Sequence, residues 1–321
     1  MAIRVGIGLG ATSFEDPRTF FRLAERCEGG GVDSLWQSDR LVGEAPSLEP
    51  MACMATLAGC TQRIKFGMNA VVVSLRNPLV LAKQCATIDH LSGGRLLPVF
   101  GVGVAGAQEW QAMGRDPAGR GRRANEALAI MSQLWRGDSV DFEGEFYRYH
   151  QARIAPLPHQ QPLPLWIGGG SKAAIQRTAR LGTGWLGGLM GSEAVGPVVQ
   201  AIRSESRAAG RPIPEDHYGA TLPFRLGNAE HPAVQRFMKL PRSLVGVPDP
   251  SSALAVGDVP AVIERIASYV AAGVSKFVCL PLAEGESDIA DQIERLVAEV
   301  LPVVEAPAFE AGIEVEGRPA G

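Results

Sequence analysis

The sequence predicts a (β/α)8 barrel of the TIM type, and three observations support this fold class. Eight strand-like apolar segments alternate with helix-like segments over nearly the whole chain. A glycine joins helix to strand at Gly31, Gly184 and Gly273. The nearly continuous apolar run 64–73 favours a parallel sheet that is buried on both faces. A doubly wound open sheet is the rival, but no G-x-G-x-x-G follows the first strand and no linker divides the chain.

The first half of the chain contains four of the expected strands. Strands are predicted at 4–9, 32–37, 64–73 and 95–102, and helices at 18–28, 48–60, 79–91, 108–113 and 119–135. Two helix starts are marked by the pairs Asp16-Pro17 and Asn77-Pro78. Each pair places an N-cap residue before a proline at the first helical position, so these boundaries are the best defined.

The second half completes the repeat and adds two insertions. Strands are predicted at 163–167, 184–188, 218–226 and 274–280, and helices at 172–181, 194–209, 259–272 and 289–304. The aromatic, glycine-rich segment 138–153 is expected to be a short β excursion, and 227–256 an irregular loop. Residues 1–305 are therefore predicted to be one barrel domain with insertions, followed by a loosely ordered tail, 306–321.

Composition and charge exclude several classes of function. The chain has 321 residues, 46% of them hydrophobic, and a net charge of −3, so neither nucleic acid nor an acidic membrane is an expected partner. No signal peptide and no apolar run of membrane-spanning length is found. Five scattered cysteines suggest reduced thiols and a cytoplasmic location. The five histidines lack metal-ligand spacing, so no metal site is expected.

The segment 162–185 contains the clearest candidate for a ligand site. A short apolar strand ends in Gly168, Gly169 and Gly170, and Ser171 then occupies the N-cap position of a helix. A helix N-terminus offers free N–H groups and a positive dipole end to an anion. An ordinary tight turn is the alternative interpretation. Three consecutive glycines exceed what such a turn requires, so a phosphate-binding turn is favoured.

Active sites of such barrels form at the carboxyl ends of the strands. Asp39 and Arg40 are the adjacent charged residues at these ends, and they could fix a polar ring or transfer a proton, or else form an ion pair that shapes the loop. Neither a second carboxylate for a glycosidase pair nor a G-x-S-x-G elbow is found. The end of the barrel at which the strands finish is called its mouth. It is glycine-rich and apolar and has few acids and bases, which suits a bound planar cofactor that would carry the difficult chemistry.

Several segments resemble one known family, the bacterial luciferase-like flavin-dependent oxidoreductases, and in particular their coenzyme F420-dependent branch. The matching segments are VDSLWQSDRL (32–41), the run from 65 to 103 that ends in LSGGRLLPVFGVG, EWQAMGRDPAGRGRRANEALAIMSQLWRG (109–137), PLWIGGGSKAAIQRTARLGTGW (164–185) and AAGVSKFVCL (271–280). They follow the family order and cover most of the chain. The resemblance therefore implies a barrel that holds a flavin or deazaflavin ring over the strand ends.

The resemblance also implies roles for individual residues. Asp39 matches an acidic position near the polar edge of the ring, and with Arg40 it is the catalytic candidate. The expected cofactor contacts are Asn69, Ala70, Val71 and Val72, in a strand bulge with a non-prolyl cis peptide; Gly101, Gly103 and Val104, beside the ring and ribityl chain; Gly168, Gly169, Gly170 and Ser171, at the phosphate; and Trp185. Arg225 is a candidate for substrate binding.

The chain departs from the family pattern at three positions and in one short segment. Arg40 stands where many F420 enzymes have a histidine, and an arginine is no ordinary proton donor. Thr183 replaces the aspartate of the family's Gly-Asp-Gly-Trp, and basic phosphate-binding residues are absent just after Trp185. Val104 replaces the luciferase arginine, so light emission is not expected.

Three functions are compatible with this resemblance. The first is F420-dependent hydride transfer to or from an organic small molecule. The second is an FMN-dependent monooxygenase supplied by a flavin reductase, and the third is a non-catalytic flavin-binding barrel. The family also implies a homodimer. The substrate is expected to be selected by 138–153 and 227–256.

Overall fold

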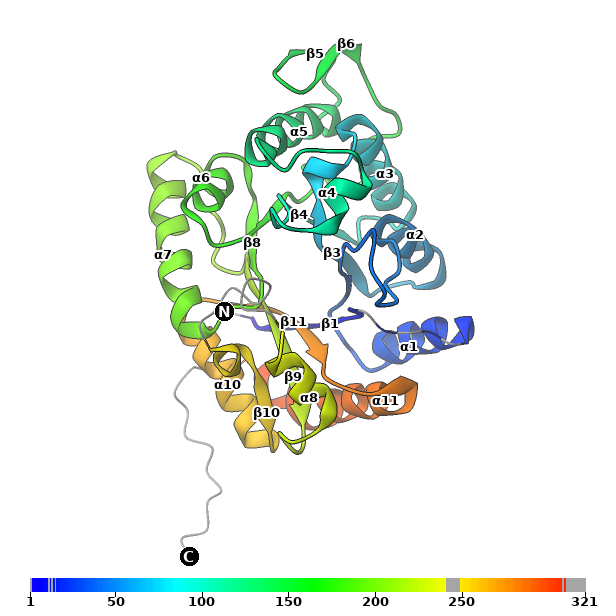
Figure 1. Ribbon diagram of the computed structural model, residues 1–321, viewed down its shortest axis with the longest axis vertical. Coiled ribbons are helices and arrows are strands. Elements are labelled where there is room, and N and C mark those ends of the chain that lie inside the picture. Colours follow the sequence, from blue (N-terminus) through cyan, green and yellow to red (C-terminus); the bar gives the residue numbers. More distant parts are fainter. Residues whose placement is uncertain are drawn as a thin grey trace, which may run out of the picture.

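The protein is a closed barrel of eight parallel strands, as the sequence predicts (Figure 1). The computed structural model describes residues 2–10, 12, 14, 16–240, 249–307 and 309. Strand β9 pairs with both β8 and β11 and so closes the ring. The barrel strands in chain order are β1 (Arg4–Gly8), β2 (Ser34–Gln37), β3 (Lys65–Val72), β4 (Leu96–Gly101), β7 (Trp166–Gly168), β8 (Gly184–Gly187), β9 (Tyr218–Leu226) and β11 (Lys276–Pro281).

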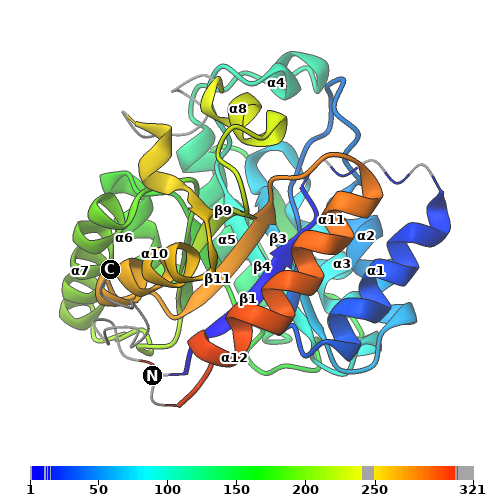
Figure 2. The ribbon, with the colours of Figure 1, turned by 90° about the horizontal axis from the view of Figure 1, so that it is seen from below.

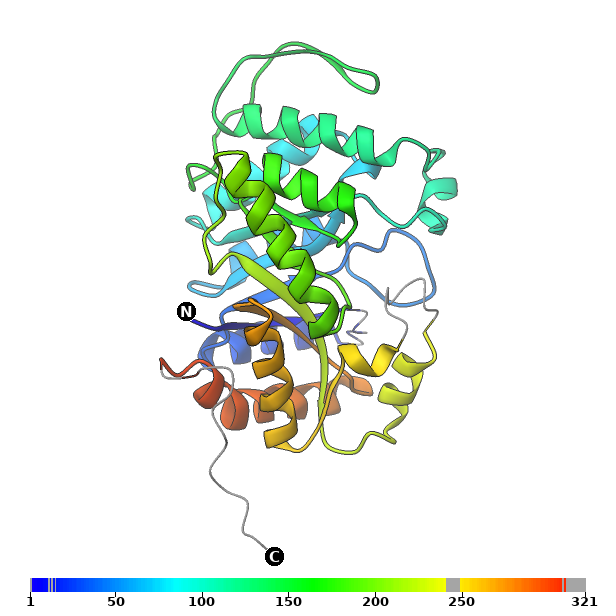
Figure 3. The same ribbon diagram turned by 90° about the vertical axis from the view of Figure 1, so that its left-hand side faces the viewer.

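Helices surround the barrel on its outer face (Figures 1 and 3). The main helices are α1 (Pro17–Gly29), α2 (Pro50–Cys60), α3 (Pro78–Leu91), α5 (Arg120–Trp135), α6 (Lys172–Leu181), α7 (Ser192–Ala208), α10 (Val259–Ala271) and α11 (Gly285–Arg295). Shorter segments are η1 (Val73–Leu75), α4 (Gln108–Ala112), α8 (Pro232–Met238), η2 (Pro250–Ala253), η3 (Leu296–Val300) and α12 (Leu301–Val304). Figure 2 shows α4 and α8 at one end of the barrel and α12 at the other.

Local capping signals define the predicted helix starts correctly. The Asp16 carboxylate accepts a hydrogen bond from the Arg18 N–H (2.9 Å), and the Asn77 side chain accepts one from the Leu79 N–H (3.0 Å). Each cap satisfies an N–H group that has no partner within its helix. Helix α6 spans the predicted residues, beginning after Ser171 and ending before Gly182.

The barrel interior is filled by a cluster separate from the main core between strands and helices. Its buried members are Trp36, Val99, Trp166, Leu186 and Val278. The two tryptophans fit only because glycines face them. A Cβ at Gly184 would lie 2.3 Å from the Trp166 ring, and one at Gly67 would lie 2.5 Å from the Trp36 ring. The interior is thus a packed core, and a ligand site must form at its end.

The predicted insertions contain more regular structure than expected. Segment 138–153 is a β excursion as predicted, since β5 (Val140–Glu143) pairs with β6 (Arg148–Ala152) away from the barrel (Figure 1). Segment 227–256 was expected to be irregular, but it contains α8, η2 and a short strand, β10 (Ala255–Gly257), that pairs with β9. Helix α8 begins at Pro232, and the His231 ring accepts a hydrogen bond from Ala233 N–H (3.3 Å), a capping role unusual for histidine. Within this insertion 241–248 lie outside the described residues.

Two other boundaries differ from prediction. Strand β7 begins at Trp166 rather than Leu163, because Pro164 has no N–H to donate to a neighbouring strand. The last helix begins at Gly285 rather than Ile289 and passes through a π-helical segment, η3. Its first turn carries Glu286 and Asp288, which favour a helix N-terminus. Most of the predicted tail, 308 and 310–321, lies outside the described residues.

Candidate functional site

The carboxyl ends of β3, β4 and β7 meet around the methyl group of Ala70. A Cβ built on Gly101 or on Gly168 would lie 3.7 Å from the Ala70 Cβ. A side chain at either glycine would therefore contact Ala70 and cover this part of the mouth. The parallel pairing of β3 with β4 and of β4 with β7 positions the three residues at the same end.

A bulge interrupts β3 at the expected position. The register with β4 shifts between Met68 and Val71, and the Asn69-Ala70 peptide bond is cis, as the family resemblance implies. The Asn69 amide donates a hydrogen bond to the Thr221 hydroxyl (2.9 Å), which in turn donates to the carbonyl of Gly187 (3.0 Å). These bonds connect β3 to β9 and β8 and hold the Asn69 side chain in place.

Asp39 is paired, but its partner is Arg76 rather than the adjacent Arg40. Its side chain is only 1% exposed and accepts hydrogen bonds from the Arg76 guanidinium (2.8 Å) and the Val72 N–H (2.9 Å). Arg76 also contacts Glu49 at 2.9 Å. Burial lowers the pKa of Arg76, but the Asp39 and Glu49 carboxylates outweigh this and raise it. Asp39 therefore shapes the backbone beside the bulge, and the sequence did not reveal Arg76 as its partner.

Arg40 has a different partner from Asp39, the carboxylate of Glu109. Its side chain is 53% exposed, and its Nη1 lies 3.8 Å from the carboxylate of Glu109, which is buried in α4. The ion pair is long and half exposed, so it contributes little to stability. Glu109 was not among the predicted site residues, although the first turn of the predicted helix 108–113 contains it. Asp39 and Arg40 are thus adjacent in sequence but bond to different groups.

The glycine turn after β7 has the geometry of an anion-binding turn. Gly169 has a φ of +98°, which favours glycine, and the Ser171 hydroxyl accepts a hydrogen bond from the Ala174 N–H (3.2 Å). Among the described residues, no acceptor is found for the backbone N–H groups of Gly170, Ser171 and Lys172. These donors and the positive end of α6 form a site suited to a phosphate.

Trp185 stabilises this turn through a hydrogen bond to its backbone. Its indole Nε1 donates a hydrogen bond to the Gly169 carbonyl (2.8 Å), and its side chain is fully buried. Trp185 therefore holds the backbone of the turn, whereas the sequence had suggested direct contact with a cofactor. That direct contact is not tested by the structure and stays a prediction.

The loop after β4 approaches the bulge closely. Gly103 has a φ of +75°, and a Cβ at this position would lie 2.8 Å from the Val72 side chain. Arg120 donates a hydrogen bond to the Gly103 carbonyl (3.2 Å), and the Trp110 indole donates one to the Val104 carbonyl (2.8 Å). The Val104 side chain is exposed and adds apolar surface next to the mouth of the barrel.

Arg225 has a partner within the protein. Its Nη1 contacts both carboxylate oxygens of Asp288 (2.9 and 3.2 Å) and the Leu282 carbonyl (2.8 Å). The Arg225 guanidinium, the Glu284 N–H and the His231 ring lower the pKa of Asp288 more than burial raises it. The charge of Arg225 is therefore neutralised, and its predicted contact with a substrate stays a prediction.

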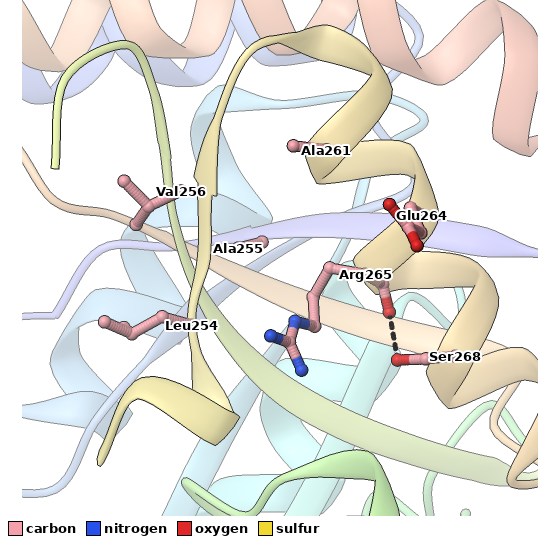
Figure 4. Close-up of a pocket in the computed structure, with 7 residues that line it drawn as sticks. All are labelled: Leu254, Ala255, Val256, Ala261, Glu264, Arg265 and Ser268. Carbon is pink, nitrogen blue, oxygen red and sulfur yellow. Dashed lines mark hydrogen bonds between the residues drawn. The ribbon is translucent and has the colours of Figure 1, made fainter. Parts of the chain in front are cut away.

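A pocket of about 340 Å³ lies outside the barrel, between β10 and α10 (Figure 4). Its walls include Val256, Glu264 and Arg265, and the Ser268 hydroxyl donates to the Arg265 carbonyl. None of the predicted site residues lines it. Within the described part of the chain, no group of three or more potential metal ligands is found, and no helix is long and apolar enough to span a membrane.

The fold is a TIM-type barrel, and the turn after β7 carries free backbone N–H groups at the start of a helix. A family model described as luciferase-like monooxygenase matches residues 1–245. The chain therefore belongs to the luciferase-like family, as its sequence motifs had indicated.

Its relatives include F420-dependent enzymes. An F420-dependent glucose-6-phosphate dehydrogenase from Amycolatopsis mediterranei is 33% identical over 194 residues, which are 57% of this chain and 57% of the relative. The enzyme of the same name from Kineococcus radiotolerans is 31% identical over 246 residues, 72% of this chain and 70% of the relative. The alignment with the Amycolatopsis relative thus spans little more than half of its length. The resemblance to the F420-dependent branch is confirmed.

Solved structures confirm the barrel. An F420-dependent secondary alcohol dehydrogenase, in complex with an F420-acetone adduct, has a TM-score of 0.81 at 17% identity, covering 94% of this chain and 98% of that one. Monooxygenase RslO1 from Streptomyces bottropensis has a TM-score of 0.80 at 21% identity, covering 94% and 99%. At these identities the likeness shows the fold alone.

Proposed function

We propose that the protein is a coenzyme F420-dependent oxidoreductase that transfers a hydride between the deazaflavin and an organic small molecule. The observation that carries this proposal is the row of free N–H groups at Gly170, Ser171 and Lys172, at the catalytic end of the barrel. The F420-dependent relatives favour the deazaflavin over a flavin. When bound, F420 supplies the two-electron chemistry, and the protein supplies binding and orientation.

The residues at the mouth of the barrel fit the phosphate and the ring of F420. The phosphate would accept hydrogen bonds from the glycine turn, where a Cβ on Gly169 would meet only the Ala174 methyl at 3.5 Å. The ring would lie against the Ala70 methyl, in the space that Gly101 and Gly168 leave free, with Val104 at its flank. These are the contacts that the family resemblance implied.

Asp39 and Arg40 have separate roles in this proposal. Asp39 positions the Val72 N–H and thereby the bulge beneath the ring. Arg40 has the more exposed side chain and is the candidate for contact with a polar edge of the ring or with the substrate. Arginine remains protonated, so Arg40 binds and orients but does not donate the proton.

An FMN-dependent monooxygenase is the second candidate. The family model carries that description, and Arg40 replaces the histidine of many F420 enzymes. This function would need a flavin reductase as partner to deliver reduced FMN. A non-catalytic flavin-binding barrel is the third candidate and differs from both by the absence of turnover.

Titration of the purified protein with F420 and with FMN separates these functions. We expect F420 to bind at least about tenfold more tightly, a difference of about 1.4 kcal/mol. Anaerobic mixing with a panel of alcohols, aldehydes and enones should then change the absorbance of the bound deazaflavin. Tighter FMN binding with oxygen consumption would overturn the F420 assignment, and binding without any turnover would favour the non-catalytic barrel.

Two variants of the glycine turn connect cofactor binding to this site. Gly169→Asp and Gly169→Asn both place a side chain on a backbone with positive φ, so both share the same conformational cost. Only the aspartate adds a negative charge at the anion site. We expect Gly169→Asp to abolish F420 binding in a folded protein and Gly169→Asn to retain more of it. Equal affinities would remove the phosphate from this turn.

We further propose a homodimer formed through α2 and α3. The outward positions of α2 carry no charge, and they are Ala52, Ala55, Thr56, Gly59 and Cys60. On the neighbouring helix α3, Val80 and Leu91 are exposed, Leu91 at 72%, and Lys83 is an exposed charged residue. By contrast α1 turns arginines and a glutamate outward. The uncharged face of α2, with the apolar residues of α3 beside it, suits a second copy of itself.

The cytoplasm is the location we propose for this dimer. All five cysteines are free, and four of them are buried. Burial raises the pKa of Cys27 and of Cys279 to about 12, so these thiols stay protonated and unreactive at neutral pH. Free cysteines are usual in a reducing compartment.

A further inference from the structure

Two helices with basic N-termini lie side by side at the barrel mouth. Helix α5 begins with Arg120-Gly121-Arg122-Arg123, and neither α5 nor α6 has an acidic residue in its first turn. Figure 1 shows α5 next to α6. The N-terminus of a helix carries a partial positive charge, so cations at this end are unfavourable unless an anion is present.

One arginine of this group has an internal counter-ion. The guanidinium of Arg122 forms two hydrogen bonds with the carboxylate of Glu145, both at 2.9 Å. Arg120, Arg123 and Arg177 form no ion pair with any carboxylate in the described ranges, but Arg123 packs over the Phe146 ring, 4.5 Å from its centroid. Arg122 therefore offers a matched control for Arg120 and Arg177.

Arg120 and Arg177 bond only to neutral oxygens. Arg120 donates to the carbonyls of Gly103 (3.2 Å) and Pro117 (3.5 Å). Arg177 donates to the Asn125 side chain (2.7 Å) and the Gly121 carbonyl (3.2 Å). Each keeps one terminal nitrogen that has no acceptor among the residues that the structure describes.

The charge of Arg177 is costly where it lies. The residue is only 7% exposed, and burial lowers the pKa of its guanidinium with no carboxylate to oppose the effect. A buried charge without a counter-ion lowers the stability of the folded protein. An anion bound next to Arg177 would remove this penalty.

Each arginine is connected to an element of the candidate site. Arg120 contacts Gly103 in the loop after β4, and Arg177 belongs to α6, which begins directly after the glycine turn. The bond from Arg177 to Gly121 brings the second arginine next to the first. Arg120 and Arg177 therefore connect the loop after β4 with α6, the helix that follows the glycine turn.

We propose that Arg120 and Arg177 bind the phosphate of the cofactor and replace the basic residues that are absent after Trp185. This inference rests on the proposed function. The phosphate would supply acceptors for both free nitrogens and a counter-charge for the N-termini of α5 and α6. The positive charge for the phosphate thus comes from two helices rather than from the segment after β8.

The test compares Arg120→Gln with Arg122→Gln, using probes that differ only beyond the ribityl chain. These probes are F420 and its phosphate-free deazaflavin riboside, and in parallel FMN and riboflavin. For Arg120→Gln, the Kd of the phosphate-bearing probe should rise about 10- to 100-fold, while that of the phosphate-free probe is unchanged. Arg122→Gln should change neither value.

A second readout separates binding from a structural role. Arg120→Gln and Arg177→Gln each lose a hydrogen bond within the protein, from Arg120 to the Gly103 carbonyl and from Arg177 to Asn125, so both should lower the Tm without cofactor. The readout is therefore the increase in Tm on adding each probe: both variants should reduce the increase caused by the phosphate-bearing probe and leave that of the phosphate-free probe unchanged. A purely structural role would reduce both increases equally.

The outcomes are distinguishable. Wild-type affinity for F420 with an unchanged Kd ratio in both arginine variants would overturn this inference and leave the proposed function standing. If wild type binds FMN but not F420, the F420 assignment fails, and the FMN and riboflavin pair still tests the arginines. If wild type binds neither, both proposals fall.

Discussion

Replacement of Asp39 by asparagine tests the ion pair that holds the bulge beside the barrel mouth. Asparagine keeps an oxygen that can accept the Val72 N–H, a bond of 2.9 Å in the wild type. It removes the negative charge that faces Arg76 at 2.8 Å. The variant therefore isolates the charge from the shape and the backbone contact.

The expected loss follows from the exposure of the two partners. Removing one member of a buried ion pair costs about 3–5 kcal/mol, because the other charge stays buried without compensation. The Arg76 side chain is 16% exposed and keeps Glu49 as a second partner at 2.9 Å, so the full penalty is not reached. We expect Asp39→Asn to lower the free energy of unfolding by about 2–3 kcal/mol.

Urea unfolding, followed by tryptophan fluorescence and circular dichroism, measures this loss. Glu49→Gln is the control, since it removes the 41% exposed partner of the same arginine and should cost less than about 1 kcal/mol. The double variant Asp39→Asn/Arg76→Met should lose less than the sum of the single losses. Equal losses for Asp39→Asn and Glu49→Gln, or strict additivity, would refute this explanation of the bulge.

Two further predictions concern acid stability and assembly. Burial raises the pKa of Asp33, but the ion pair with Lys276 has the larger opposite effect, so the pKa in the folded protein lies below the ordinary 3.8. The ion pair therefore stabilises the folded protein above about pH 4, and this contribution is lost as the pH falls through the pKa of Asp33 in the folded protein. Asp33→Asn should flatten that part of an acid-unfolding curve, and an unchanged curve would contradict the pair. Ala55→Arg should convert a dimer to a folded monomer in light scattering, whereas Arg18→Ala on the charged helix α1 should not. A wild-type monomer would contradict the α2–α3 interface.

The elements that follow from local chemistry were predictable from the sequence. The eight-fold repeat, the proline-marked helix starts and the whole of α6 depend on residues near each boundary, and the structure confirms them. Helix α8 was missed because its cap is His231, whose ring seldom fills this role. Its neighbours in 227–256 gave no periodicity long enough to indicate a helix.

The site was predictable only where one short segment forms it. The glycine turn is such a segment, because its backbone requires glycine at Gly169 and a cap at Ser171. The pairing of Asp39 with Arg76 joins residues that follow two neighbouring strands, so it exists only after β2 and β3 have paired. Sequence adjacency suggested Arg40 instead, but Arg40 lies near Glu109 of α4, a contact between segments far apart in the sequence.

The basic start of α5 shows how a departure from a local rule can indicate function. Natural sequences tend to agree with their structure at every level, and violations concentrate where a ligand provides the compensation. Arg120 at a helix N-terminus and buried Arg177 without a carboxylate both break such rules, and the bond from Arg177 to the Gly121 carbonyl brings them close to each other. Arg122 is instead paired with Glu145, and Arg123 packs over the Phe146 ring. On this reasoning Arg120 and Arg177 are the residues proposed to bind the negative charge of the cofactor.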